Sequence, residues 1–274
     1  MLNKFFRFSI LFTVFFGLST LVHAQAILAV SEGTSGGLDS AQVVSKYQAI
    51  ADILGKAANE KINIILVRDF ASLEEGMKEG RFKYVIARPS DYPARGIRDY
   101  RYQYIASAKP DGQCFFVVDK SSPLQRLSDS KGKRFLLAEP AAYMAKLCRA
   151  ELRDNGIVIE KENVQRIKDQ QATGFYLKNS FADVAGIASY SAIAKKWEKE
   201  GNRIIHKSVP QPYNPLIAQK SLPPEAVLRI RTALSNLNQT DTGKAVLSSL
   251  SFDSFEFDPQ GELRLLRLLT WLEK

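Results

Sequence analysis

Short apolar runs alternate with segments of helical periodicity along the chain, and the alternation begins a second time near its middle. In the first third, apolar runs at Ile27–Val30, Ile62–Val67 and Tyr84–Ala87 predict strands. Helical segments over about 40–58 and 73–79 separate them. Strands that alternate with helices usually pair in parallel through right-handed crossovers, so the pattern predicts an α/β fold with a parallel sheet.

Two helix starts in this block carry capping signals. Asp39 or Ser40 precedes a segment whose apolar residues, including Tyr47, recur at three- and four-residue steps. Ser72 and Glu75 have the spacing of a capping box. They predict that the second helix begins at about residue 73.

The second block repeats the pattern. Its expected strands are Cys114–Val118, Arg134–Ala138 and Val184–Ile187, with helices near Ala142–Asp154 and Ser191–Lys199. The repeat predicts a second α/β unit rather than one continuous sheet.

A proline-rich stretch separates this block from the C-terminal helices. Pro210, Pro212 and Pro215 each remove a donor from a β-ladder, so we expect regular structure to be interrupted there. A short strand and three helices are expected to follow, at Leu216–Ala218, Pro223–Leu237, Thr242–Leu250 and Glu262–Leu272.

Two α/β blocks predict two lobes with a ligand cleft between them. We expect the first lobe to comprise residues 25–112 and a return segment, 208–274, that carries the C-terminal helices. The second lobe is then an insertion of residues 113–207. The sheets should be rich in parallel strands and flanked by helices.

The N-terminus has the features of a secretory signal peptide. Lys4 and Arg7 flank an apolar run, and Val22-His23-Ala24 resembles a small-residue cleavage site. We therefore expect residues 1–24 to be removed and the mature protein to be exported to the periplasm. Because no cysteine stands at the cleavage site, a lipoprotein anchor is not expected.

Composition argues against catalysis and against nucleic acid as a partner. Removal of Lys4 and Arg7 lowers the formal net charge from +9 to +7, and the remaining charges alternate in sign without a basic cluster. One histidine, His206, would remain, together with two cysteines. The chain has no nucleophile elbow, dinucleotide fingerprint or zinc-protease motif, so we expect no enzyme, no cofactor and no metal.

Four expected loops favour an anionic ligand. Ser31–Ser40, Arg68–Ser72, Arg88–Tyr92 and Glu139–Tyr143 follow strands or open helices, where backbone N–H groups are free to bind anions. Arg68 and Arg88 add guanidinium donors that suit oxyanions. Each arginine is equally explained by a structural salt bridge, and Tyr47 by a place in the core.

The order of several motifs resembles that of the phosphate/phosphite/phosphonate-binding family of periplasmic solute-binding proteins. The similarity covers a helix tyrosine at Tyr47, the segment 68–73, the glycine-led strand 80–85 and the turn Arg88-Pro89-Ser90-Asp91-Tyr92. It continues through 127–140, 183–186 and 221–225. The resemblance implies a type II periplasmic binding protein that closes on a small anionic solute for an ABC transporter permease. It also implies that Tyr47 and Tyr92 bind the ligand.

The chain departs from this family at the anion site. Family members usually have a Ser/Thr-rich turn where this chain has Glu139-Pro140-Ala141-Ala142-Tyr143, whose only side-chain hydroxyl is that of Tyr143. The family's later histidine has no counterpart, and Ser189 and Tyr190 replace the acids of aminophosphonate binders. Two alternatives therefore stay open: a sensor subunit for a membrane histidine kinase, and a member that has lost the family's ligand.

Cys114 and Cys148 allow three interpretations. An even pair in an exported protein favours a disulfide, and two buried structural thiols are also consistent with the pattern. Because Cys114 stands beside the first crossover, it could instead be a functional thiol, as in related solute-binding proteins that sense arsenite. His206 is expected to be a surface or packing residue.

The sequence thus predicts a periplasmic solute-binding protein that is a monomer. The partners expected are a small anionic solute and an inner-membrane permease or sensor kinase. The candidate ligand-binding residues are Tyr47, Arg68, Arg88, Ser90, Tyr92, Tyr143 and Ser189.

Overall fold

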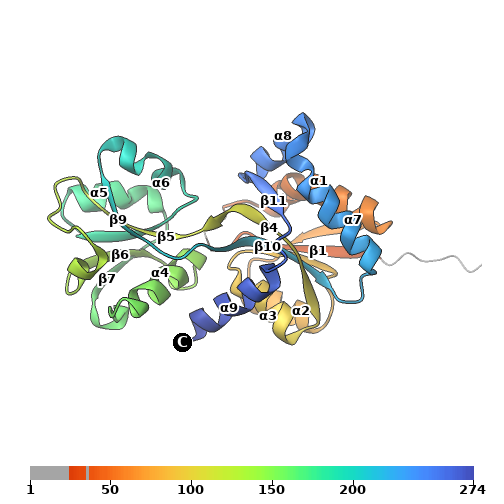
Figure 1. The fold of residues 1–274 in the computed structure, drawn as a ribbon, viewed down its shortest axis with the longest axis horizontal. Coiled ribbons are helices and arrows are strands. Elements are labelled where there is room, and N and C mark those ends of the chain that lie inside the picture. Colours follow the sequence, from red (N-terminus) through yellow and green to blue (C-terminus); the bar gives the residue numbers. More distant parts are fainter. Residues whose placement is uncertain (1–24, 35–36) are drawn as a thin grey trace, which may run out of the picture.

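A computed structural model describes residues 25–34 and 37–274, which form two lobes with one sheet each (Figure 1). The expected signal peptide, residues 1–24, lies outside the described residues. Among the residues described, no helix is both long and apolar enough to cross a membrane.

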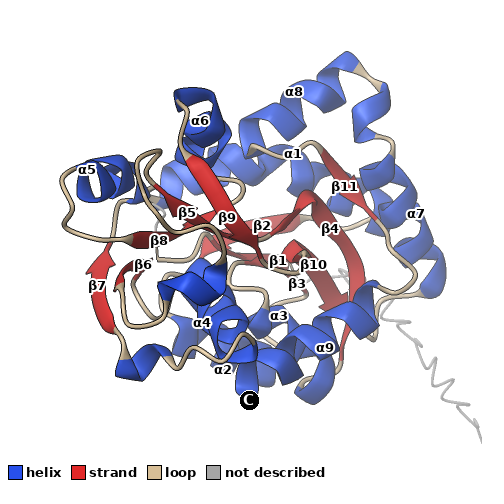
Figure 2. Ribbon diagram, turned by 60° about the vertical axis from the view of Figure 1, so that its left-hand side comes forward, coloured by secondary structure: helices blue, strands red, loops and turns tan. Residues whose placement is uncertain are grey.

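The first lobe is built on a six-stranded sheet in the order β11-β4-β10-β3-β1-β2. Helices α1, α7 and α8 cover one face of this sheet and α2, α3 and α9 the other (Figure 2). The strands are β1 (Ala26–Ser31), β2 (Ile62–Leu66), β3 (Tyr84–Ala87), β4 (Tyr102–Gly112), β10 (Gln211–Gln219) and β11 (Ser254–Glu256). The helices are α1 (Ser40–Ala58), α2 (Phe70–Lys78), α3 (Asp91–Asp99), α7 (Pro224–Ser235), α8 (Asp241–Leu250) and α9 (Gly261–Glu273).

The second lobe is built on a five-stranded sheet in the order β7-β6-β8-β5-β9. Its strands are β5 (Cys114–Val118), β6 (Arg134–Ala138), β7 (Asn163–Ile167), β8 (Val184–Ala188) and β9 (Arg203–Lys207). Helices α5 and α6 lie on one side of this sheet and α4 on the other (Figure 2). These helices are α4 (Tyr143–Asp154), α5 (Thr173–Lys178) and α6 (Ala192–Trp197).

Both sheets are mixed, with parallel and antiparallel pairs, in the helix-flanked α/β fold that the sequence indicated. The β1–β2, β1–β3, β6–β7 and β6–β8 pairs are parallel. The strands next to the crossovers run the other way: β10 pairs antiparallel with β3 and β4, and β5 with β8 and β9. Parallel neighbours are usually joined by a helix. The strands at the crossovers continue directly from the other lobe instead, so they need not run parallel to their neighbours.

The proline-rich stretch interrupts regular structure only in part, because residues 208–210 lie outside any strand while the prolines after them do not. It forms part of β10, a nine-residue strand in which Pro212 and Pro215 both lie. The β10–β4 ladder has register shifts between Gln211 and Tyr213 and between Tyr213 and Pro215. Irregular positions of this kind tolerate residues that lack a backbone donor.

The helix starts agree with the sequence at α1 and differ at α2. Asp39 caps α1 in a capping box: its carboxylate accepts from the backbone N–H of Gln42, and its own backbone N–H donates to the Gln42 side-chain oxygen. The cap of α2 is Asp69, whose carboxylate accepts from the backbone N–H of Ser72 at 2.7 Å, so α2 begins three residues earlier than the Ser72 motif predicted. Asp is as good an N-cap as Ser, and here it comes first along the chain.

Candidate functional site

A cleft of about 710 Å³ lies between the lobes. It collects the loops that follow β1, β3, β6, β7 and β8, as expected for the carboxyl ends of strands in an open α/β sheet. The first lobe contributes Gly33, Thr34 and Arg88. The second lobe contributes Ala138, Glu139, Ala142, Tyr143, Met144, Ile167, Lys168, Asp169, Gln170, Gln171, Ala188, Tyr190, Ser191 and Ala192.

Arg88 is the guanidinium that the first lobe presents to this cleft. Its side chain is 14% exposed, and its Nε donates to the carbonyl oxygen of Glu32 at 3.0 Å. Its Nη1 donates to the Tyr213 hydroxyl at 2.9 Å. Burial works against the charged form, but the oxygens of Tyr213, Tyr190 and Glu32 outweigh it and raise the pKa of Arg88. The arginine is therefore a fixed positive charge with a set orientation.

Glu32 places a negative charge behind that arginine. Its Oε1 accepts from Lys46 Nζ at 2.7 Å and from the Tyr47 hydroxyl at 2.8 Å, and its Oε2 lies 3.7 Å from Arg88 Nη2. Burial alone would raise the pKa of Glu32, but the hydrogen bond and charge of Lys46, with Tyr47 and Arg88, lower it. Tyr47 is 2% exposed, and its hydroxyl donates to this carboxylate. The Glu32 carboxylate partly offsets the positive charge of Arg88.

Two tyrosines stack across the lobes above Arg88. Tyr190, from the loop after β8, lies 4.2 Å from Tyr213 of β10 between ring centroids, at an interplanar angle of 25°. The guanidinium carbon of Arg88 lies 5.8 Å from the Tyr190 ring centroid and 6.0 Å from that of Tyr213. Tyr213 was missed in the sequence because it lies in the proline-rich stretch; a strand prediction there could have placed it beside the cleft.

Two of the predicted hydroxyl groups bind the backbone of β10 beside the second crossover. Ser90 Oγ and Tyr143 Oη both donate to the carbonyl oxygen of Pro212, at 2.8 and 2.7 Å. Both side chains are buried, and Tyr143 also contributes to the cleft lining. These bonds fix the start of α3 and the start of α4 against β10.

Three other predicted residues lie outside the cleft lining. Arg68 is exposed, and its Nη2 donates to the carbonyl oxygen of Leu38 at 2.8 Å. The Tyr92 ring stacks on Phe70 at a centroid distance of 4.9 Å. Ser189 Oγ accepts from the backbone N–H of Gln113 at 3.0 Å, beside the first crossover. Each has a structural partner where it stands.

The second lobe faces Arg88 with both donors and acids. Among the described residues no side chain caps α4 at Ala142, so N–H groups of its first turn lie at the cleft without a capping side chain. Glu139 and Asp169 line the same cleft, together with Lys168. The sequence placed Glu139 in this turn but assigned it no role, and it suggested no partner for an amine. The structure supplies two carboxylates within the lining.

Cys114 and Cys148 form a disulfide that joins β5 to α4. Cys114 is fully buried and Cys148 is 1% exposed, so neither sulfur is a thiol in the cleft. This pairing corrects the interpretation of Cys114 as a functional thiol. Gly186 is required beneath it, because a Cβ there would lie 2.7 Å from Cys148 Sγ and 2.6 Å from Leu137 Cδ2.

No metal centre is present in the part of the chain that the structure describes. No group of three or more His, Cys, Asp and Glu residues within residues 25–34 and 37–274 could hold a metal ion. His206 pairs with Glu151 through Nε2 at 2.7 Å, a packing role between β9 and α4.

A family model described as the periplasmic substrate-binding protein of phosphonate ABC transporters matches residues 37–257. The chain belongs to this family. Proteins of the family bind solutes for ABC transporters and are not enzymes, which confirms the prediction that this chain is no enzyme. The two-lobe α/β fold agrees with that of type II periplasmic binding proteins.

Several solved structures have a similar fold. XAC2383 from Xanthomonas citri, in a structure bound to ATP, is 15% identical with a TM-score of 0.70 over 90% of this chain and 96% of that one. PhnD1 from Prochlorococcus marinus, in complex with methylphosphonate, is 12% identical with a TM-score of 0.65 over 91% and 98%. A binding protein of an ABC phosphonate transporter from Pseudomonas aeruginosa is 15% identical with a TM-score of 0.63 over 91% and 87%. These identities show a shared fold.

Proposed function

We propose that this protein captures an organic phosphonate, or a similar singly substituted oxyanion, between its lobes and delivers it to an ABC transporter permease. The observation that carries the proposal is that Arg88 of the first lobe and the first turn of α4, which has no side-chain cap among the described residues, line the same cleft. A guanidinium and free helix N–H groups converging on one space suit the oxygens of a phosphoryl group. We also propose that residues 25–112 with 208–274, and residues 113–207, move as units about the crossovers.

The size and charge of the cleft favour a substituted ligand over a bare ion. Its volume of about 710 Å³ falls within the range of roughly 300–1,000 Å³ that is typical of pockets for organic ligands. Met144, Ile167 and Tyr190 offer apolar surface for a substituent. Glu139 and Asp169 would oppose a second negative charge and favour a substituent that carries an amine.

Ligand binding by wild-type protein, residues 25–274, tests this proposal. Isothermal titration should give saturable one-to-one binding for at least one alkyl- or aminoalkylphosphonate and weaker binding for phosphate and sulfate. Arg88→Gln should abolish that binding while Arg68→Gln, an exposed arginine outside the cleft, leaves it unchanged. Equal loss in both variants, with both folded by circular dichroism, would contradict the proposed site.

The sensor alternative shares the fold and differs in the partner. Its arsenite form needs a free thiol, whereas Cys114 is bonded to Cys148. Arsenite binding that appears only after reduction of the disulfide would favour the sensor, and adjacent genes for a histidine kinase would support it. Binding of no phosphonate by folded protein would favour a member that has lost the family's ligand.

A further inference from the structure

The helix α4 of the second lobe contacts the first lobe along one side. Its first residue, Tyr143, donates to the Pro212 carbonyl, and Lys146 Nζ lies 2.6 Å from Asp91 Oδ2 at the start of α3. Near its last turn, Asp154 Oδ2 accepts from Trp271 Nε1 of α9 at 2.5 Å. Helical geometry puts positions 143, 146 and 154 within one arc of roughly 80°. One face of α4 is therefore fastened to the first lobe along its length.

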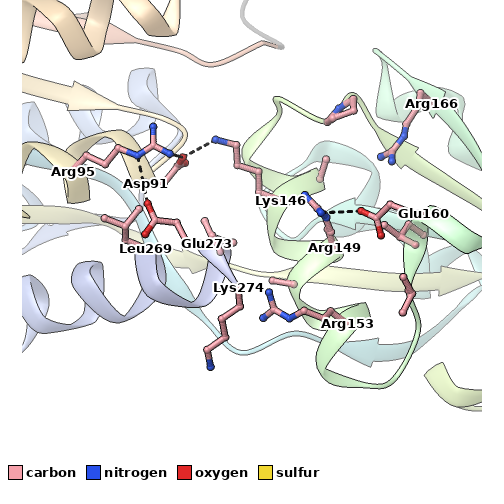
Figure 3. Close-up of a pocket in the computed structure, with 16 residues that line it drawn as sticks. Asp91, Arg95, Lys146, Arg149, Arg153, Glu160, Arg166, Leu269, Glu273 and Lys274 are labelled. Carbon is pink, nitrogen blue, oxygen red and sulfur yellow. Dashed lines mark hydrogen bonds and ion pairs between the residues drawn. The ribbon is translucent and has the colours of Figure 1, made fainter.

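A groove of about 460 Å³ surrounds the middle contact, on the face of α4 that does not line the ligand cleft. Figure 3 shows Lys146 extending from α4 to Asp91, while Arg149 pairs with Glu160 within the second lobe. Arg149 and Glu160 are 2.9 Å apart and both exposed. The Asp91–Lys146 pair is thus an ion pair in the groove that joins the two lobes.

Asp91 is unusually dependent on this partner. The residue is 2% exposed, and its Oδ1 has no hydrogen-bond partner in the described structure. Its other neighbour, Arg95 Nη2, lies farther away, at 3.8 Å. A buried carboxylate without its closest cation is strongly unfavourable. Moving the lobes apart at this point removes Lys146 from Asp91 and must admit water in its place.

We propose that Asp91–Lys146 and Trp271–Asp154 form an interlobe latch that holds the empty protein with its lobes together. Contacts between the lobes stabilise the arrangement in which they form, relative to arrangements in which α4 lies farther from the first lobe, before any ligand arrives. A ligand that binds this arrangement of the lobes then binds more tightly, in proportion to the fraction of protein already in it. The latch contributes to affinity without touching the ligand.

Small-angle X-ray scattering of ligand-free residues 25–274 tests the latch, with no need to know the ligand. A compact chain of this length should have a radius of gyration of roughly 18 Å. We expect the double variant Asp91→Asn/Lys146→Met, which leaves no buried unpaired charge, to have a larger radius of gyration than wild type. Trp271→Phe should increase it further when combined with that variant.

Glu160→Gln is the matched control, since it removes an ion pair of the same groove that lies within one lobe. It should leave the radius of gyration unchanged. Acrylamide quenching of tryptophan fluorescence gives a second readout. Trp197, the other tryptophan, is buried, so a change in quenching reports on Trp271 at the latch. Folded double variant with the scattering profile and quenching of wild type would overturn the proposal.

Discussion

Glu32→Gln should weaken the fold and strengthen anion binding at the same time. The carboxylate accepts from Lys46 and Tyr47 and lies 3.7 Å from Arg88 Nη2. Loss of its charge weakens two charge-assisted hydrogen bonds, so we expect the free energy of unfolding to fall by about 1–2 kcal/mol. The same change removes a negative charge behind the arginine that faces the ligand.

The gain in affinity follows from Coulomb's law. A ligand oxygen bound to Arg88 would lie on the order of 7 Å from the Glu32 carboxylate, which gives about 2 kcal/mol of repulsion at an effective dielectric constant of 20. Screening by water and salt in an open cleft reduces this to roughly 1 kcal/mol. We therefore expect about fivefold tighter binding of a phosphonate by isothermal titration.

Glu60→Gln is the matched control for this prediction. Glu60 accepts from Lys83 Nζ at 2.5 Å and from the Tyr84 hydroxyl at 2.6 Å, the same pair of residue types, at the far end of β3 from Arg88. Glu60→Gln should lower the free energy of unfolding by about as much as Glu32→Gln does, with no change in affinity for the phosphonate. Unchanged or weaker phosphonate binding in folded Glu32→Gln would refute the placement of the anion at Arg88.

The remaining predictions concern the disulfide, its glycine, the acids of the cleft and pH. Cys114→Ser/Cys148→Ser opens a loop closed over 34 residues and should lower the free energy of unfolding by about 3–4 kcal/mol in urea titrations, with phosphonate affinity unchanged; equal stability with and without the bridge would contradict this. Gly186→Ala should cost about 1–3 kcal/mol, measured in the same way, because its Cβ meets Cys148 Sγ; a neutral effect would show that β8 can shift. Glu139→Gln should tighten binding of methylphosphonate and weaken that of an aminoalkylphosphonate, and titrations in which both shift in the same direction would argue against its proposed role. The pKa of Glu32 is below 4.5 in the folded state, so its stabilisation is present above pH 4.5 and lost as the pH falls through the lowered pKa; unfolding of Glu32→Gln should depend less on pH in that acidic range than unfolding of wild type.

Strands buried on both faces were the most predictable part of the fold. The runs Tyr84–Ala87, Cys114–Val118 and Arg134–Ala138 have the bounds that the sequence indicated. A strand between two layers of helices is apolar over its whole length, so both of its ends can be recognised in the sequence. Strands β4 and β10 were missed or shortened because they carry tyrosines, prolines and charged residues near the crossover, where composition is set by the hinge and the cleft.

The candidate site was predictable only where one loop defines it. Arg88 and Tyr143 were found because each follows a recognisable strand, and both line the cleft. The Tyr190–Tyr213 stack joins residues from different lobes, and no local pattern reports such a pair. Tyr47 fits the helical spacing of the core, and its hydroxyl bond to Glu32 required the tertiary structure.

The most direct test of the account is a titration of wild-type residues 25–274 and of Arg88→Gln with a panel of phosphonates, phosphate and sulfate. A thermal-shift format is sufficient, because a ligand at 100 times its dissociation constant stabilises by about 2.7 kcal/mol. That corresponds to a rise in Tm of roughly 5–11 °C for a protein of this size. The account predicts such a rise for a substituted phosphonate with wild type and none with Arg88→Gln. A flat panel with folded wild type, or an equal rise in the variant, would contradict it.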